Sequence, residues 1–101
     1  MANTPTRSDV DYDDELAYWR ENYAQEPYYR PDYTFEHYEI AYRVGAEARQ
    51  RHRGRSFDEV EDELRTEYER TRGDSPLTWE EGRGAVRAAW NRLDRMFPDS
   101  D

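Results

Sequence analysis

Residues 56–93 read SFDEVEDELRTEYERTRGDSPLTWEEGRGAVRAAWNRL, and this stretch decides the fold. Ser56 and Glu59 have the S-x-x-E spacing of a capping box, in which two residues satisfy each other's free main-chain N–H groups at a helix start. Thr78 and Glu81 repeat this spacing after a turn that contains Gly, Asp, Ser and Pro. The apolar residues at helical spacing are Phe57, Val60, Leu64 and Tyr68, and then Trp79, Val86, Trp90, Leu93 and Phe97. We therefore predict two amphipathic helices that form an antiparallel hairpin.

A shorter helix is expected near the start of the chain. Asp13 or Asp14 is placed to cap it, and it should end before Pro27, because proline lacks the N–H group that continues a helix. Its apolar face is formed by Leu16, Trp19 and Tyr23. Residues 1–11 show no such periodicity and are predicted to be a flexible tail, and residues 98–101 are predicted to be an acidic C-terminal tail.

A second long helix is expected after a connector rich in tyrosine. The connector, residues 27–34, reads PYYRPDYT, and its two prolines favour an extended chain. Thr34 is placed to cap the helix, and Gly54 is placed to end it. The apolar stripe of this helix is Tyr38, Ala41, Tyr42, Gly45 and Ala48. Because three of these residues are small, we expect the helix to pack closely against another helix.

These segments predict an all-α fold, a small four-helix bundle with a short first helix and three longer ones. A chain of 101 residues has room for one core, so we expect a single helical domain over residues 12–97. Aromatic residues make up 15% of the chain, and their large rings compensate for a small number of aliphatic residues. We expect the hydroxyls of the tyrosines at positions 28, 29, 33, 38 and 42 to reach water at the edge of this core.

The charge and composition of the chain exclude several classes of protein. All fifteen basic residues are arginine and 24 residues are acidic, which gives a net charge of −9. An acidic surface disfavours binding to nucleic acid and to anionic membranes. No apolar run approaches the roughly 18 residues that span a bilayer, and the N-terminus lacks a signal-peptide pattern, so a cytoplasmic location is expected. The chain has no cysteine and therefore no disulfide and no thiol nucleophile.

The sequence contains no recognisable catalytic or metal-binding constellation. His37 and His52 lack a third histidine or a cysteine that would complete a transition-metal site. The acidic run at residues 9–15 lacks the central glycine of a calcium loop. No nucleophile is spaced with a base, and no pair of carboxylates is set in an apolar pattern. We therefore expect no enzymatic activity, no metal or cofactor, and no small-molecule substrate.

A basic segment from Arg43 to Arg55 opposes the acidic balance of the chain. Residues 37–55 contain five Arg and two Glu, a local charge of +3, whereas residues 56–73 contain seven acidic residues and three Arg. We interpret the acidic residues as a solvated helix face. Three interpretations of the basic segment stay open: internal ion pairs, head-to-tail association between copies, and binding of phosphate groups. Internal pairing is the simplest, since surface ion pairs are common and individually weak.

Several motifs together carry a resemblance to a known family. They are WRENY at residues 19–23, the tyrosine-rich connector, AYRVG at 41–45, GRSFDEVE at 54–61, LTWEE at 77–81 and AVRAAWNR at 85–92. In these motifs the chain resembles a family of short, uncharacterised bacterial proteins found in stress-associated contexts. The resemblance implies a single small domain and a role in stress physiology, and it brings no enzymatic role with it.

Tyrosine and arginine, which dominate the connector and the basic segment, are enriched at protein interfaces. We therefore predict a non-enzymatic protein-binding or self-associating module, with nucleic-acid binding through the Arg43–Arg55 segment as the alternative. The connector and the second helix are expected to form the binding surface. Its candidate residues are Tyr28, Tyr29, Tyr33, Arg49, Arg51, Arg53 and Arg55.

Overall fold

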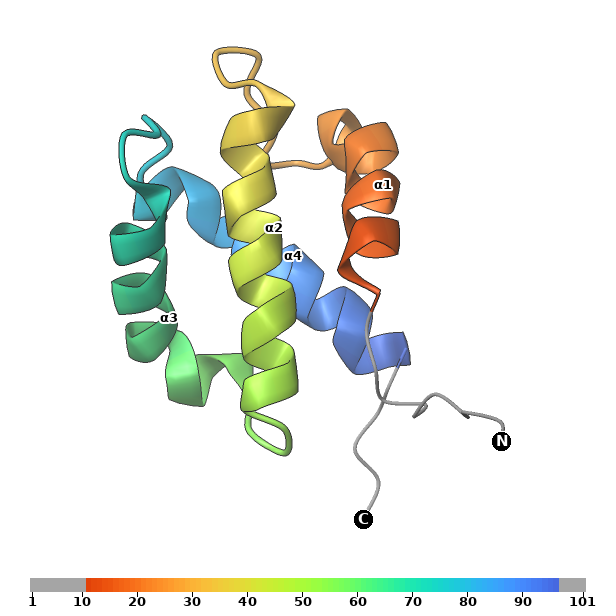
Figure 1. The fold of residues 1–101 in the computed structure, drawn as a ribbon, viewed down its shortest axis with the longest axis vertical. Coiled ribbons are helices and arrows are strands. Elements are labelled where there is room, and N and C mark those ends of the chain that lie inside the picture. Colours follow the sequence, from red (N-terminus) through yellow and green to blue (C-terminus); the bar gives the residue numbers. More distant parts are fainter. Residues whose placement is uncertain (1–10, 97–101) are drawn as a thin grey trace, which may run out of the picture.

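The computed structural model describes residues 11–96, in which it contains four α-helices (Figure 1). They are α1 (Tyr12–Asn22), α2 (Phe35–Arg51), α3 (Phe57–Arg72) and α4 (Trp79–Met96), and a short 3-10 helix η1 (Tyr23–Gln25) follows α1. The predicted all-α fold, with a short first helix and three longer ones, is confirmed. Phe97 and the predicted tail residues 1–10 and 98–101 lie outside the described residues.

The helix α2 lies at the centre of the molecule (Figure 1). α1 and α3 lie on its two sides, and α4 crosses behind it at an angle. α4 packs mainly against α2, whereas the contact between α3 and α4 in the predicted hairpin is smaller. Among residues 11–96, no helix is both long enough and apolar enough to cross a membrane.

Small residues allow α2 and α4 to pack closely. Those buried are Ala41, Gly45 and Ala48 on α2, and Ala85 and Ala89 on α4. The four predicted core residues of α3 are buried, as are the four of α4 that the structure describes. The apolar periodicity therefore identifies the core-facing side of each of these helices.

Three tyrosines lie fully inside the core. Tyr38, Tyr42 and Tyr68 are at most 1% exposed. The Tyr68 hydroxyl donates a hydrogen bond to the carbonyl of Leu77 at 2.7 Å, and the hydroxyls of Tyr42 and Tyr28 share one at 2.6 Å. The expectation that these hydroxyls reach water was wrong for Tyr38 and Tyr42, because protein groups satisfy them instead.

α1 contacts both α2 and α4. The indole of Trp19 stacks on the ring of Tyr42, with centroids 4.5 Å apart and an interplanar angle of 7°. Glu15, which is 5% exposed, accepts a hydrogen bond from Nε of Arg92 in α4 at 2.9 Å. Trp19 therefore fixes α1 to α2, and Glu15 fixes it to α4.

The start of α1 differs from the prediction. Asp11 is the N-cap, and its carboxylate accepts hydrogen bonds from the main-chain N–H groups of Asp13 (3.1 Å) and Asp14 (3.3 Å). The predicted caps Asp13 and Asp14 lie in the first turn instead, where negative charge favours the positive end of the helix dipole. The prediction was wrong because all three aspartates have the same capping chemistry, and the backbone conformation alone distinguishes them.

The boundary between α2 and α3 follows the predicted signals with one exception. Ser56 and Glu59 form the expected capping box: the Ser56 N–H donates to Glu59 Oε1 at 2.9 Å, and the Glu59 N–H donates to Ser56 Oγ at 3.2 Å. Gly54 does not end α2, because the C-cap is His52. Gly54 instead takes a positive φ of 81° in the turn that leads to α3, a conformation that favours glycine.

The connector is tied to the starts of two helices. Thr34 is the N-cap of α2, as predicted, and its N–H donates to Nδ1 of His37 at 3.2 Å. The hydroxyl of Tyr33 donates a hydrogen bond to the carboxylate of Glu81 in the first turn of α4. The same carboxylate oxygen of Glu81 also accepts a hydrogen bond from the Thr78 hydroxyl at 3.5 Å, and the Glu81 N–H donates to Thr78 Oγ1 at 3.3 Å.

Candidate functional site

The predicted binding residues do not form one surface. They are Tyr28, Tyr29 and Tyr33 before α2, and Arg49, Arg51, Arg53 and Arg55 at and beyond its other end. The Tyr28 hydroxyl reaches that of Tyr42 in the middle of α2, and at a rise of about 1.5 Å per residue Arg51 lies roughly 13 Å further along the helix than Tyr42. The connector and the basic segment are therefore two separate regions.

The tyrosines of the connector are largely used for packing, and all three are half-buried. The Tyr28 hydroxyl is bonded to Tyr42, and the ring of Tyr29 lies edge-on to Tyr23 with centroids 5.4 Å apart. The Tyr33 hydroxyl is bonded to Glu81. Rings that are held in this way leave little free face on which a ligand could stack.

Arg49 is removed from the basic surface. Its side chain is 2% exposed, and its Nε lies 3.1 Å from Oδ1 of Asp94 in α4. The prediction of Arg49 as a residue of an exposed binding surface was therefore wrong. Its side chain instead joins α2 to α4. The alternating arginines of the sequence do not indicate this role.

The other three arginines predicted to bind are exposed but lie on different parts of the surface. Arg51 lines a groove between α2 and α3. Arg55 lines a smaller hollow of about 220 Å³ together with Arg87 of α4. Arg53 lies between them in the turn after α2. Arg51 and Arg55 thus line two different hollows, and Arg53 lines neither of them.

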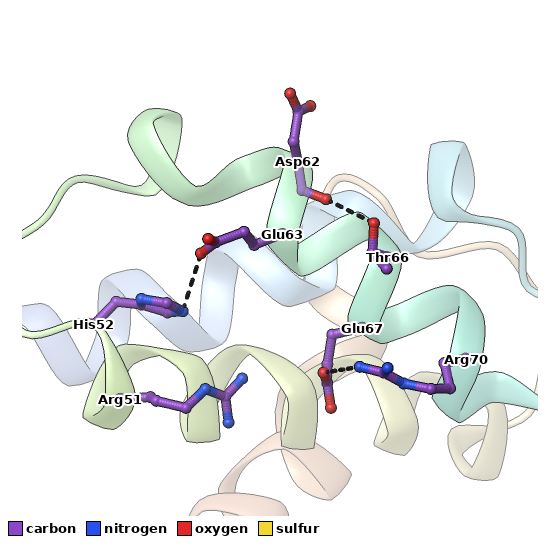
Figure 2. A pocket seen from close by; sticks show the side chains of 7 residues that line it. All are labelled: Arg51, His52, Asp62, Glu63, Thr66, Glu67 and Arg70. Carbon is purple, nitrogen blue, oxygen red and sulfur yellow. Dashed lines mark hydrogen bonds and ion pairs between the residues drawn. The ribbon is translucent and has the colours of Figure 1, made fainter.

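The groove has a volume of about 520 Å³ and lies between the C-terminal end of α2 and the outer face of α3 (Figure 2). Arg51 and His52 line it from the side of α2. The residues from α3 are Asp62, Glu63, Thr66, Glu67 and Arg70. Spacings of three and four place these five on one side of the helix. The sequence predicts this side as a solvated face, and the groove exists because the end of α2 lies beside it.

Most charges inside the groove are paired with one another. His52 Nε2 lies 3.5 Å from Oε1 of Glu63, and Arg70 Nη2 lies 2.6 Å from Oε1 of Glu67. Arg51 projects beside these pairs (Figure 2) and makes no hydrogen bond or ion pair with any residue that the structure describes. Its guanidinium is therefore available to a ligand.

Acidic side chains form the outer rim of the groove. The Asp62 carboxylate points away from the groove interior (Figure 2), while its main-chain carbonyl accepts a hydrogen bond from the Thr66 hydroxyl at 3.2 Å. The Glu63 side chain is 63% exposed, so its contact with His52, which is an ion pair only when the histidine is protonated, lies at the solvent edge and is weak. The groove thus combines one free cation with a rim of accessible carboxylates.

The side chains of the groove offer recognition by charge and hydrogen bonding. The Thr66 hydroxyl is bonded to a main-chain carbonyl, and no bond from it to His52 is formed that would activate it as a nucleophile. Throughout the part of the chain that the structure describes, no three His, Asp or Glu side chains are grouped to hold a metal ion.

An ion pair on the opposite side of α3 holds the helix in position. Arg83 of α4 binds the carboxylate of Glu61 through Nε and through Nη2, the latter at 3.1 Å. This hydrogen-bonded guanidinium lowers the pKa of Glu61 below its ordinary value. Because α3 is fixed to α4 on this side, its acidic side is left facing the end of α2.

Comparisons of the chain with family models, with curated proteins and with solved structures find no match. The groove and its charges therefore carry the functional argument.

Proposed function

We propose that the chain is a non-enzymatic protein-binding module whose groove holds a mixed-charge segment of a partner protein. One observation carries this proposal: Arg51 projects into the groove without an ion pair to the described residues, while the charges next to it pair with one another. An acidic side chain of the partner would bind Arg51. Basic residues beside it would face the carboxylates of Asp62 and Glu63.

The chemistry of arginine supports Arg51 as the anchor. Its planar guanidinium can donate two parallel hydrogen bonds to one carboxylate, and charge-assisted bonds of this kind are stronger than neutral ones. Arginine is also one of the residues that supply most of the binding energy at protein interfaces. The groove volume of about 520 Å³ is enough for a few side chains, and the rest of the segment would lie along α3.

The net charge favours a partner that is basic overall. At −9 the chain attracts positively charged proteins and repels a second copy of itself, so self-association is the weaker form of the proposal. Nucleic acid is also disfavoured, because the carboxylates of Glu63 and Glu67 line the same groove as Arg51 and would repel phosphate groups. The family resemblance of the sequence motifs supports a place for this module in stress physiology, in the cytoplasm.

Three labelled synthetic peptides test the proposal: one rich in Glu, one rich in Arg, and one in which the two residues are mixed. We expect the mixed peptide to bind most tightly when affinity is measured by fluorescence anisotropy. Arg51→Ala should weaken this binding about tenfold or more, because a hydrogen bond to a charged group contributes about 1.5–3 kcal/mol. Arg65→Ala is the matched control, since Arg65 is an exposed arginine of α3 that does not line the groove.

Equal affinity of the wild type and Arg51→Ala for the mixed peptide would overturn the proposal. A dimer detected by light scattering that dissociates in Arg51→Ala would show that the groove serves self-association. Displacement of the peptide by a single-stranded oligonucleotide, with a steep dependence on salt, would establish nucleic-acid binding instead.

A further inference from the structure

Four aromatic rings form a continuous row from α1 to the connector. Trp19 stacks on Tyr42 with centroids 4.5 Å apart, Tyr42 lies 6.4 Å from Tyr38, and Tyr38 lies 6.2 Å from Tyr33. Each distance lies in the range of direct ring contact. Indole and phenol side chains can each lose one electron, so the row offers a path along which an electron vacancy can move from ring to ring.

Tyr33 is the last ring of the row, and its hydroxyl, unlike those of Tyr38 and Tyr42, is bonded to a carboxylate. Tyr33 donates its hydrogen bond to Glu81. By contrast, the Tyr42 hydroxyl shares a bond with the Tyr28 hydroxyl at 2.6 Å, and Tyr38 donates to the main-chain carbonyl of Tyr28 at 3.4 Å. A phenol and an amide carbonyl are very weak bases, whereas a carboxylate readily accepts a proton.

We propose that Tyr33 is a redox site, the residue at which a one-electron oxidation of the aromatic core is collected. A phenol that loses an electron becomes strongly acidic, so the loss is easiest where a base lies within hydrogen-bond distance. Glu81 supplies that base to Tyr33. Tyr33 is half-buried at the surface end of the row, where a reductant in solution can reach it, whereas Trp19 is 4% exposed.

The reaction starts when a one-electron oxidant, such as the carbonate radical anion, takes an electron from the row and becomes carbonate. The vacancy moves to Tyr33, the O–H bond of Tyr33 breaks, and its proton passes to Oε1 of Glu81. Tyr33 is left as a neutral phenoxyl radical beside a carboxylic acid. A thiol then returns a hydrogen atom to the Tyr33 oxygen and becomes a thiyl radical, and Glu81 releases its proton to water.

Tyr29 provides a matched comparison within the same molecule. It lies in the same connector, it is half-buried like Tyr33, and its ring lies 6.4 Å from Tyr38. No carboxylate accepts a hydrogen bond from its hydroxyl among the described residues. The two tyrosines are therefore equally placed to receive a vacancy from Tyr38, and they differ in the base that Glu81 provides.

The experiment exposes the full chain to carbonate radicals at low dose in the presence of a nitroso spin trap, and locates the trapped radical by peptide mass spectrometry. We expect Tyr33 to carry several-fold more adduct than Tyr29. Glu81→Gln keeps a hydrogen-bond acceptor but removes the base, so the Tyr33 share should fall toward that of Tyr29. Tyr38→Phe keeps the ring but interrupts the row, so the absolute yield of adduct should fall at both Tyr33 and Tyr29, because Tyr38 contacts both rings.

An equal yield at Tyr33 and Tyr29 in the wild type would overturn the proposal, and this comparison requires no variant to fold. An unchanged Tyr33 share in Glu81→Gln would show that the carboxylate has no role. An unchanged absolute yield at Tyr33 in Tyr38→Phe would show that the oxidant attacks Tyr33 directly and that no vacancy travels along the row. Circular dichroism of both variants confirms that the helices are retained before the yields are compared.

Discussion

Gly45 of α2 lies directly against the main-chain carbonyl of Val86 in α4, so that no space is left for a Cβ atom between the two helices. A Cβ on Gly45 would also lie 3.1 Å from the Cβ of Ala89. Glycine inside a helix costs about 0.5–1 kcal/mol relative to alanine. The close approach of α2 and α4, which is the main helix contact of the molecule, gives this unfavourable residue its physical reason.

Gly45→Ala should therefore lower the free energy of unfolding by about 1–3 kcal/mol, the usual cost of overpacking a core. Urea unfolding followed by circular dichroism measures this change. Ala17→Gly, at an exposed position of α1, calibrates the propensity effect alone and should cost about 0.5–1 kcal/mol. A Gly45→Ala variant that is more stable than the wild type would contradict the observed contact.

Asp94→Ala should destabilise the protein through the buried guanidinium of Arg49. The change removes the carboxylate that pairs with Arg49, whose side chain is 2% exposed. This loss should cost about 1–3 kcal/mol in the free energy of unfolding. Asp62→Ala is the control, because Asp62 is exposed and its carboxylate forms no ion pair within the described residues. Equal stability of the two variants would show that the pair of Arg49 and Asp94 contributes nothing.

Deprotonation of Tyr68 should lower the free energy of unfolding at alkaline pH. Burial raises the pKa of Tyr68 from 10.0 to about 12, so the unfolded chain loses the phenolic proton first. The resulting stabilisation is complete below pH 10 and is lost as the pH rises toward about 12. Tyr68→Phe should cost about 1 kcal/mol at neutral pH through its lost hydrogen bond to Leu77. This difference should shrink in alkali, and urea titrations that show it constant with pH would refute the assignment.

Glu61 should produce a loss of stability at the acid end. Its pKa is lowered from 4.5 by the hydrogen-bonded guanidinium of Arg83. The contribution is present above pH 4.5 and disappears as the pH falls through the pKa of the folded state. Glu61→Gln should therefore be less stable than the wild type at neutral pH and equally stable in strong acid. Thermal melts across this pH range measure the difference in stability. A difference between the wild type and Glu61→Gln that stays constant with pH would show that the pair of Glu61 and Arg83 is not its cause.

Local signals in the sequence predict most of the helices. The capping box of Ser56 and Glu59 and the apolar stripe that follows it predict α3, because both depend on residues within a few positions of each other. The errors occur where neighbours are chemically alike. Asp11 caps α1 in place of Asp13 or Asp14, and His52 ends α2 before Gly54 is reached, since the backbone conformation of single residues decides these boundaries.

The sequence predicts much less of the candidate site than of the helices. Arg49 and Arg51 are two residues apart and look equivalent, yet each residue of a helix is rotated by about 100° from the previous one. Arg49 therefore turns toward α4 and Asp94, whereas Arg51 turns toward the groove beside α3. The hydrogen bond of Tyr33 to Glu81 also escapes prediction, because it joins residues 48 positions apart in the chain.

The sequence by itself determined that this protein is a bundle of one short and three longer helices, because helix starts and apolar faces depend on short-range spacing. Only the tertiary structure decided which charged residues are buried, which pair with each other and which stay free at the groove. The crossing of α2 and α4 at Gly45 sets the position of α3 and of the end of α2, and those positions depend on long-range packing that no local spacing encodes.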